Sequence, residues 1–287
     1  MRKHLQGIDH VVIAVTDLDQ AQTDFQRLGF TLTPRGRHTM GSQNHCAMFP
    51  SDYFELLAVP ADHPVTRYYS DFLRQGDGLA ALALKTDDAK GFQAELVRDG
   101  IGCDEPVDFS RPVNLPEGVR DAAFRIAQVH IAETPGGRTF VCQHFTRDVV
   151  WRPEYLVHAN GAIGLQGISL LVDKAGFDDV RSAYERLFDR QAEGAGDAGV
   201  IWKVATGDTP ITVLTPDGFK NNYRGGKLGG RSLPYVAALH FQVQSIKQAQ
   251  QFLDQVDVGF TVRSDQSLAV ASELTHGLVI VFTELSA

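Results

Sequence analysis

This chain of 287 residues repeats a short pattern near its two ends. Residues 15–22 read VTDLDQAQ and residues 243–250 read VQSIKQAQ, and each stretch continues to the tripeptide Gly-Phe-Thr, at 29–31 and 259–261. Both copies place an apolar strand before an Asp or Ser that can cap a helix, and a glycine where that helix ends. Because such self-similarity indicates duplication of one structural unit, it constrains the fold more than any single motif does.

Two looser copies, at residues 82–88 and 167–173, complete a set of four. Registered on their first strands, the copies lie at intervals of 71, 86 and 71 residues, with these residues at equivalent positions: His10, Ala81, Gly167 and Ala238. Two equal intervals around a longer one predict two pairs of units. We therefore predict a first domain over 1–150, a linker over 151–163 and a second domain over 164–287.

Short runs with period-two alternation and intervening turn residues follow each expected helix, which indicates antiparallel hairpins. The repeated unit is therefore βαβββ. We predict an α+β fold of four such modules, paired into two domains whose curved mixed sheets each enclose a cavity, the kind of concave surface that small molecules bind.

Composition excludes several classes of protein. The net charge of −8, from 35 acidic and 27 basic residues without a basic block, argues against a nucleic-acid partner. The longest apolar stretches, such as 11–15 and 79–84, are too short to cross a bilayer. Three scattered cysteines form neither a disulfide framework nor a zinc motif, so a cytoplasmic protein is expected. The expected partner is a small-molecule ligand, because the paired sheets enclose a cavity.

Several stretches carry a resemblance to a known family. Residues 7–18 (GIDHVVIAVTDL), 28–30 (LGF) and 53–57 (YFELL) are similar to the vicinal oxygen chelate superfamily, which includes glyoxalases, bleomycin-resistance proteins and extradiol dioxygenases. Residues 36–38 and 41–44 resemble more narrowly its glyoxalase-like domain subgroup. The resemblance implies the paired βαβββ fold and a ligand cavity, but fold alone does not define the reaction.

The resemblance also implies metal ligands on the first and last strands of paired units. Carried over, it assigns His10 and Glu55 as ligands of a divalent ion such as Zn, Ni, Mn or Fe, with Glu55 also the catalytic residue. His144, or His130 on the preceding strand, is the candidate third ligand. The alternative is that Glu55 points into a wet cavity, while His10 hydrogen-bonds locally and His144 ends a strand near the surface.

The other units depart from the ligand pattern. Ala81 replaces a second histidine, residues 140–145 contain no acid, and Gly167 and Ala238 hold the ligand positions of the second half. Extradiol chemistry, which needs two histidines and a carboxylate, is therefore not expected. We expect a structural role for the second half, which closes over or dimerises with the first.

Four residues are predicted to bind the substrate. His38 and Asn44 lie between the first helix and Glu55, although a simple hairpin turn explains them equally well. Arg111 and Arg125 lie in the second unit, where a planar guanidinium can bind an anionic group, although exposed arginines are usually just solvated.

Two functions remain open from the sequence. The first is an enzyme in which a metal polarises the oxygens of a small carbonyl compound, a lyase or isomerase similar to lactoylglutathione lyase. The second is a metal-free protein of bleomycin-resistance type that binds or sequesters a small molecule. A homodimer is compatible with both.

Overall fold

The computed structural model describes residues 2–38, 41–60, 66–193, 202–205, 209–223 and 230–284, with residues 202–205 described by their backbone alone. The first half contains two βαβββ units. The elements of the first unit are β1 (Leu5–Ala14), α1 (Leu18–Arg27), β2 (Gly36–Arg37), β3 (Gln43–Met48) and β4 (Tyr53–Ala58). Those of the second are β5 (Gly78–Thr86), α3 (Ala89–Arg98), β6 (Val107–Leu115), β7 (Gly118–Gln128) and β8 (Arg138–His144).

The second half repeats this order. Its first unit shows, in the described residues, β9 (Ala162–Leu171), α5 (Phe177–Phe188), β10 (Trp202–Ala205) and β11 (Pro210–Leu214). Its second unit has β12 (Tyr235–Val243), α7 (Ile246–Gln255), β13 (Phe260–Val262), β14 (Leu268–Val270) and β15 (Val279–Glu284). Short helices connect these units: α2 (Arg67–Leu73), α4 (Arg147–Val150), η3 (Pro153–Tyr155) and α6 (Pro216–Asn222). Two more lie within units, η2 (Ile131–Glu133) between β7 and β8, and η4 (Ser272–Leu274) between β14 and β15.

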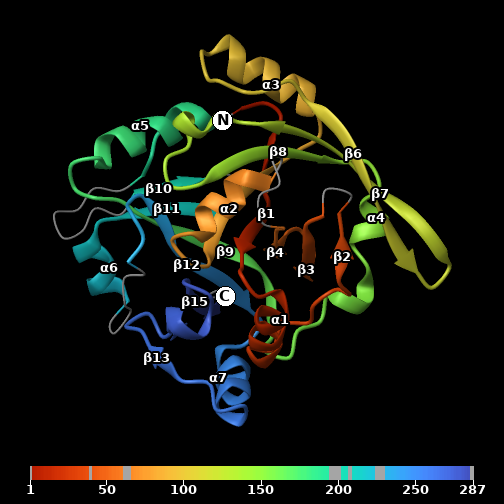
Figure 1. Ribbon diagram of the computed structural model, residues 1–287. Coiled ribbons are helices and arrows are strands. Elements are labelled where there is room, and N and C mark those ends of the chain that lie inside the picture. Colours follow the sequence, from red (N-terminus) through yellow and green to blue (C-terminus); the bar gives the residue numbers. More distant parts are fainter. Residues whose placement is uncertain are drawn as a thin grey trace.

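Strands occupy the centre of the molecule, while α1, α3, α5 and α7 lie around its outside (Figure 1). The predicted α+β class with βαβββ modules is confirmed. The predicted helix caps are present as well, because the side chains of Asp17, Asp88 and Ser245 each accept a hydrogen bond from a backbone N–H in the first turn of α1, α3 and α7.

Strand register relates the two units of each half by a local two-fold axis. On the antiparallel pair β1 and β5, His10 lies opposite Ala83 and Val12 opposite Ala81. On β9 and β12, Gly167 lies opposite His240 and Ser169 opposite Ala238. Each first strand also runs parallel to the last strand of its own unit, β1 to β4, β5 to β8, β9 to β11 and β12 to β15. The equivalences inferred from the repeat spacing therefore agree with the ladder.

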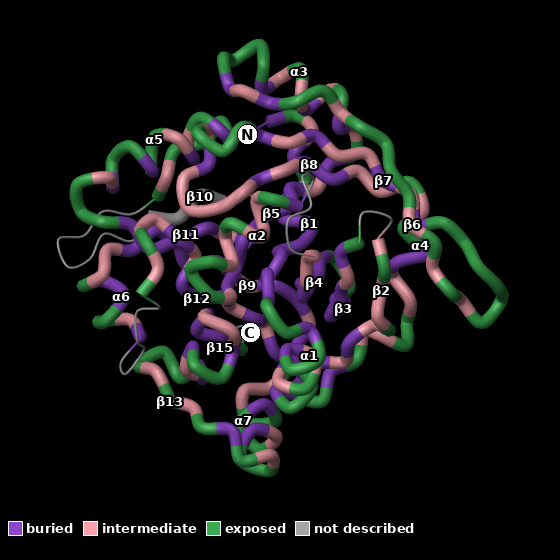
Figure 2. Tube along the Cα trace, viewed as in Figure 1, coloured by how far each residue is buried: buried purple, intermediate pink, exposed green. Residues whose placement is uncertain are grey.

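The two halves share one sheet and one core. Leu79 on β5 pairs with Val236 on β12, which joins the two halves of the sheet. Behind it the buried rings of Phe30 and Phe54 pack with Phe241 of the second half, at centroid distances of 5.0 Å between the first two and 4.9 Å from Phe30 to Phe241. Figure 2 shows this buried interior running through the central strands.

The segment predicted as a linker is folded onto the first half. His158 is buried: its Nδ1 accepts the backbone N–H of Thr31 at 3.0 Å, so its Nε2 donates to the Met48 carbonyl at 2.9 Å. Asn160 is buried too, and donates to the Leu28 carbonyl at 2.9 Å. The division into separate domains at 150 and 164 thus stays a proposal.

The concave faces of the two halves differ. In the second half, Phe219 of α6 and Tyr223, which follows α6, belong to one buried cluster with Ala238 of β12 and Val281 of β15. The Tyr223 hydroxyl also hydrogen-bonds His240 Nε2 at 2.8 Å. A helix therefore fills the space that the first half leaves open.

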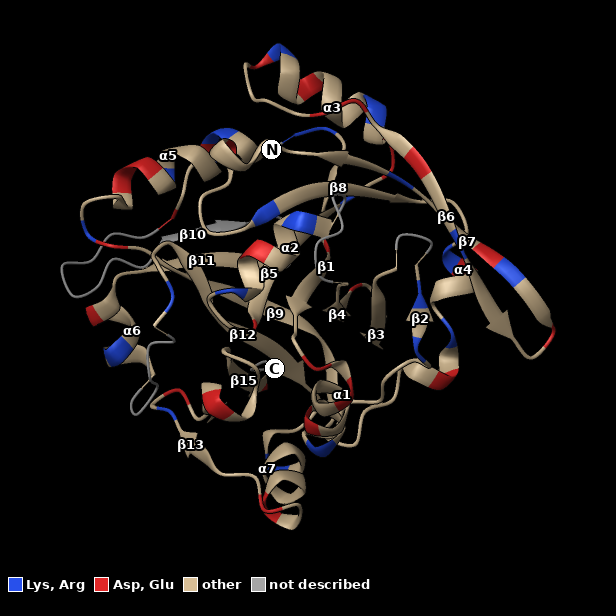
Figure 3. Cartoon of the chain, viewed as in Figure 1, with Lys and Arg blue, Asp and Glu red and all other residues tan. Residues whose placement is uncertain are grey.

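Charged residues of both signs are interspersed along α3, α5 and the β6–β7 hairpin (Figure 3). None of the helices in the described ranges combines the length and apolar character of a membrane span.

Candidate functional site

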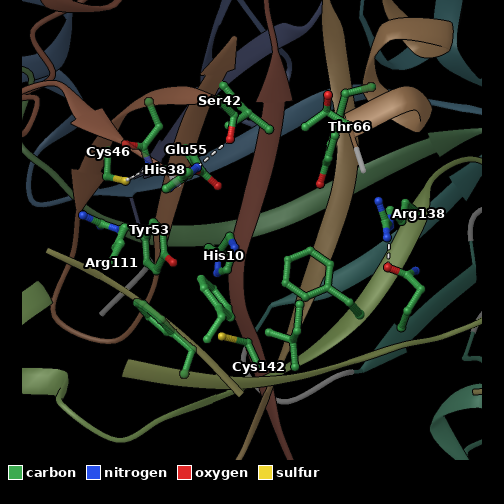
Figure 4. A pocket seen from close by; sticks show the side chains of 18 of the residues that line it. His10, His38, Ser42, Cys46, Tyr53, Glu55, Thr66, Arg111, Arg138 and Cys142 are labelled. Carbon is green, nitrogen blue, oxygen red and sulfur yellow. Dashed lines mark hydrogen bonds between the residues drawn. The ribbon is translucent and has the colours of Figure 1, made fainter. Parts of the chain in front are cut away.

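A cavity of about 220 Å³ opens between the strands of the first two units. Its charged and polar lining comes from both units, and Figure 4 shows these side chains around one space. The residues that can hydrogen-bond or ionise there are His10, His38, Ser42, Asn44, Cys46, Tyr53, Glu55, Thr66, Tyr69, Ser110, Arg111, Gln128, Arg138 and Cys142. The rest of the wall is apolar: Leu57, Phe109, Phe124, Ile126 and Phe140.

A bulge in β1 sets the position of His10. The β1–β5 register shifts between Ile8 and His10, so Asp9 is an extra residue in the strand. Neighbours in a regular strand point to opposite faces, but at this bulge His10 Nδ1 lies 2.7 Å from Asp9 Oδ2. The ring also stacks on Tyr53 at 4.3 Å and meets the Phe140 ring edge-on at 5.5 Å. Because Nδ1 is bound to Asp9, Nε2 is the nitrogen left for the cavity.

Asp9 is shared by two imidazoles. It is fully buried, and His144 Nε2 lies 2.9 Å from the same Oδ2 atom. Burial acts to raise the pKa of Asp9, but the hydrogen bonds and charges of His10 and His144 outweigh it and hold the pKa far below its ordinary value. The carboxylate therefore stays ionised and accepts from both rings.

Glu55 comes from β4, at the register position of Val12 on β1. It is nearly buried, and its Oε1 atom accepts a hydrogen bond from Asn44 Nδ2 at 2.5 Å. His38 lies nearby, with its Nδ1 2.7 Å from Ser42 Oγ. Burial lowers the pKa of His38, more strongly than the negative charge of Glu55 raises it. His38 is therefore neutral near pH 7, and its role is that of a hydrogen-bonding group.

The two predicted substrate-binding arginines lie in different places. Arg111 lines the cavity. Arg125 is paired with Asp108 through two hydrogen bonds, of 2.5 and 2.8 Å, and is not part of the lining. Both lie on the β6–β7 hairpin, but only one of them can reach a ligand in the cavity.

The three predicted metal ligands, His10, Glu55 and His144, do not come together as one group. The two-fold axis relates His10 and Glu55 to Ala81 and Phe140, which offer no ligand atoms. In the described part of the chain, one trio of candidate ligand atoms lies within 4.8 Å of one another, and it groups His144 with Asp9 and Cys142 rather than with Glu55. His144 is thus not brought to Glu55.

The trio itself fits a hydrogen-bonded network better than a metal centre. His144 binds Asp9 through Nε2, and its other nitrogen, Nδ1, is on the far side of the ring, buried and without a partner. A metal among the three residues would have to displace that hydrogen bond. Burial also raises the pKa of the Cys142 thiol well above its ordinary value, so the thiol is protonated in the metal-free protein.

Of the residues predicted from the sequence, the structure brings His10, Glu55, His38, Asn44 and Arg111 to one cavity. The sequence did not indicate Asp9 or Arg138. Arg138 reaches the cavity from β8, with its guanidinium 5.5 Å above the Tyr68 ring and its Nε on Gln128. Asp9 is adjacent to His10 in the sequence, and this was the one sign of its role. In a regular strand, however, the Asp9 side chain would point to the face opposite that of His10.

Comparison with known families and structures gives a consistent result. The model of the glyoxalase-like domain family matches residues 8–188. A solved hypothetical protein from Staphylococcus aureus superposes with a TM-score of 0.69 at 11% identity, covering 97% of this chain and 99% of that one. A mutant 4-hydroxymandelate synthase from Streptomyces coelicolor gives 0.65 at 16% identity, covering 98% and 93%.

A fusion protein of a xylose isomerase-like barrel and a 4-hydroxyphenylpyruvate dioxygenase gives a TM-score of 0.60 at 12% identity, covering 99% of this chain and 49% of that one. Comparison with curated proteins gives no match. At these identities the structural matches show a shared fold alone, and the family model over residues 8–188 is what confirms the predicted resemblance.

Proposed function

This chain belongs to the glyoxalase-like domain family, and on that premise we propose that it is an enzyme that transfers protons within a small carbonyl compound bound in its first-half cavity. One observation carries the proposal. The cavity wall holds two proton-transfer groups, the His10 imidazole fixed by a buried carboxylate and the Glu55 carboxylate fixed by Asn44.

In the proposed reaction, Glu55 accepts a proton from the carbon beside the substrate carbonyl. The electrons of that C–H bond form the C=C bond of an enediol, while protonated His10 donates its Nε2 proton to the carbonyl oxygen. When the deprotonated carbon bears a hydroxyl, that hydroxyl returns its proton to His10 and its O–H electrons form the new C=O bond, while the C=C electrons take the Glu55 proton at the former carbonyl carbon, so the isomerisation needs no oxidant. Without that hydroxyl the intermediate is an enol, and reprotonation at the same carbon exchanges its hydrogen. Asp9 stabilises the charged imidazole through Nδ1, as carboxylates do in other acid–base pairs.

The proposed step is written with groups of the protein, because His10 and Glu55 do not form a three-ligand group with His144, which lies with Asp9 and Cys142 instead. The function expected from the resemblance, a metal-assisted lyase or isomerase, is therefore kept as an alternative outcome of the experiment below.

The experiment measures deuterium exchange in D₂O by proton NMR. The probes are dihydroxyacetone, pyruvate, phenylpyruvate and 2-hydroxyacetophenone, with the protein prepared in the presence of EDTA. We expect exchange at carbon beside the carbonyl of at least one probe, slowed by about 100-fold or more in Glu55→Gln and in His10→Gln. Glu154→Gln, at an exposed position outside the cavity, is the matched control and should keep the full rate.

Two results would overturn the proposal. One is exchange no faster than in buffer for every probe, and the other is an undiminished rate in Glu55→Gln. If exchange instead requires added Zn²⁺, Ni²⁺, Mn²⁺ or Fe²⁺, and Glu55→Gln loses the bound metal, the metal-assisted mechanism replaces the one proposed.

Binding without turnover is the second candidate. It is favoured by the apolar residues Ala81 and Phe140 at the positions related to His10 and Glu55, which leave the cavity a mainly apolar container. It predicts saturable ligand binding with no exchange in any probe.

A further inference from the structure

Resting on the proposed function, we infer that the substrate is a small carboxylate with an apolar, preferably aromatic body, and that its carboxylate binds Arg111. Arg111 then determines the specificity for an anionic ligand. Its side chain has no carboxylate partner among the described residues, and the wall around it contains aromatic rings.

Arg111 differs from the other arginines around it. Arg120 is paired with Asp148 at 2.7 Å, and Arg125 is paired with Asp108. Arg138 is bound by Gln128 and covered by the Tyr68 and Tyr69 rings. Within the residues that the structure describes, no carboxylate lies within 4.0 Å of the Arg111 guanidinium and no hydrogen bond engages it. Arg111 therefore has donors to offer a ligand.

The Arg111 side chain reaches the first unit beside Gly36 and Asn44. A Cβ atom on Gly36 would lie 3.6 Å from Arg111 Nη1 and 2.1 Å from Asn44 Oδ1. The guanidinium thus lies close to the Asn44 side chain, which in turn donates to Glu55. A carboxylate bound to Arg111 would therefore place the rest of a short molecule beside Glu55.

The charge of Arg111 acts on the cavity. Burial is the largest effect on the pKa values of His38 and Cys46, lowering the first and raising the second. Beside it, the charge of Arg111 acts to lower both pKa values and the charge of Glu55 acts to raise both. Arg111 and Arg138 both line the cavity, and Arg138 is already bound to the neutral Gln128, so the guanidinium of Arg111 is the one that can attract an anion at its end of the cavity. A planar guanidinium binds a carboxylate through two parallel hydrogen bonds, which fixes the orientation of the ligand as well as its charge.

Aromatic rings provide the surface for the rest of the ligand. Phe109 and Phe124 stack at 4.9 Å with an interplanar angle of 19°, and both line the cavity with Ile126 and Phe140. Phe109 is 40% exposed, which is high for a phenylalanine and places an apolar ring at the opening. The volume of about 220 Å³ is below the roughly 300–1,000 Å³ of sites for drug-sized molecules, so the ligand is a small one.

The experiment is calorimetric titration with matched pairs of probes. Benzoate, phenylacetate, 3-phenylpropanoate and hexanoate are each compared with their primary amide, which has nearly the same shape and no charge. We expect at least one carboxylate to bind about tenfold or more tightly than its amide. Arg111→Gln should remove that preference, and Arg111→Lys should restore part of it. Arg125→Gln, on the same hairpin but paired outside the cavity, is the matched control and should keep it.

The inference is overturned if no carboxylate binds at millimolar concentration, if acid and amide bind equally, or if Arg111→Gln keeps the preference. These results are independent of turnover. A carboxylate preference that depends on Arg111 stands even when no probe exchanges deuterium. Exchange of neutral carbonyl compounds, with no preference for acids, would support the proposed function and contradict the carboxylate inference.

Discussion

At the scale of single residues, His276 connects the two halves through charge. Its Nδ1 lies 2.8 Å from Asp77 Oδ2 and its Nε2 lies 3.1 Å from Asp24 Oδ2, so both ring nitrogens face carboxylates. Burial alone would lower the pKa of His276, but the hydrogen bonds and charges of Asp77 and Asp24 outweigh it and raise the pKa above 6.5. The protonated ring is therefore the form that stabilises the folded protein.

The sign of the pH dependence follows. The stabilisation is fully present below the unfolded-state pKa of about 6.5 and is lost as the pH rises through the higher folded-state pKa. We predict that His276→Gln lowers the free energy of unfolding by about 1–3 kcal/mol at pH 6 and by less at pH 9, measured by urea denaturation. His130→Gln, at a 55% exposed side chain with one carboxylate partner, should show a much smaller effect. Equal losses at both pH values for His276→Gln would contradict the assignment.

The family resemblance pointed to His10 and Glu55, and their places in apolar strands agreed with it, because polar side chains there need a wet or hydrogen-bonded place. The same reasoning could not find Asp9, since strand alternation puts neighbours on opposite faces and a bulge has no clear sequence signature. Arg111 and Arg125 looked alike in the sequence, and what separates them is the pairing of Arg125 with Asp108 across the hairpin.

At the scale of elements, the end of α5 depends on the N-terminal Arg2. Its side chain is 3% exposed and donates to the Leu187 and Arg186 carbonyls at 2.7 Å each, while Nη1 contacts Asp99 at 2.6 Å. These carbonyls belong to the last turn of the helix, where they lack partners within it. Arg2 thus satisfies the end of α5 and ties it to the chain after α3.

We predict that Arg2→Met, which keeps an apolar stem, lowers the free energy of unfolding by about 2–4 kcal/mol, because the buried guanidinium loses its contact with Asp99 and two carbonyl bonds together. Thermal and urea unfolding of the purified variant measure the change. Arg98→Met is the matched control, since Arg98 pairs with the same Asp99 but is 70% exposed, and it should lose far less. Similar losses in both variants would show that the helix end does not need Arg2.

Elements with a clear local pattern were predictable, and those without one were not. The caps at Asp17 and Ser245 and the buried stripe of Val180, Tyr184 and Leu187 on α5 follow from short-range rules. Helix α6 did not stand out, because it is only seven residues long and its burial against β12 is a tertiary effect. The repeat has the same spacing in both halves, so it could not predict that the first half has an open cavity and the second half a filled face.

At the scale of the whole molecule, side-chain contacts join the two halves in addition to the covalent chain. Arg231 of the second half lies 3.6 Å above the Phe72 ring and donates to the Phe72 carbonyl at 3.2 Å. Arg27 donates to the Val256 and Asp257 carbonyls across the same boundary. The 71-residue intervals predicted the pairing within each half, but these contacts join residues more than 150 positions apart and leave no periodic signal.

The shared core leads to a prediction about cooperativity. Phe30 and Phe54 bury part of their surface against Phe241, so each half would expose apolar rings if the other unfolded first. We predict that the two halves unfold in a single transition. The chain has one tryptophan in each half, Trp151 and Trp202, so the variants Trp202→Phe and Trp151→Phe report on each half separately. In each variant, the midpoint in urea by tryptophan fluorescence should coincide with that by far-ultraviolet circular dichroism.

Independent domains divided at residues 151–163 would instead give two midpoints, and residues 1–163 expressed alone would fold with native circular dichroism. Either result would establish two domains, whereas coincident midpoints, with aggregation of the isolated first half, would establish one cooperative unit whose cavity depends on the second half for its support.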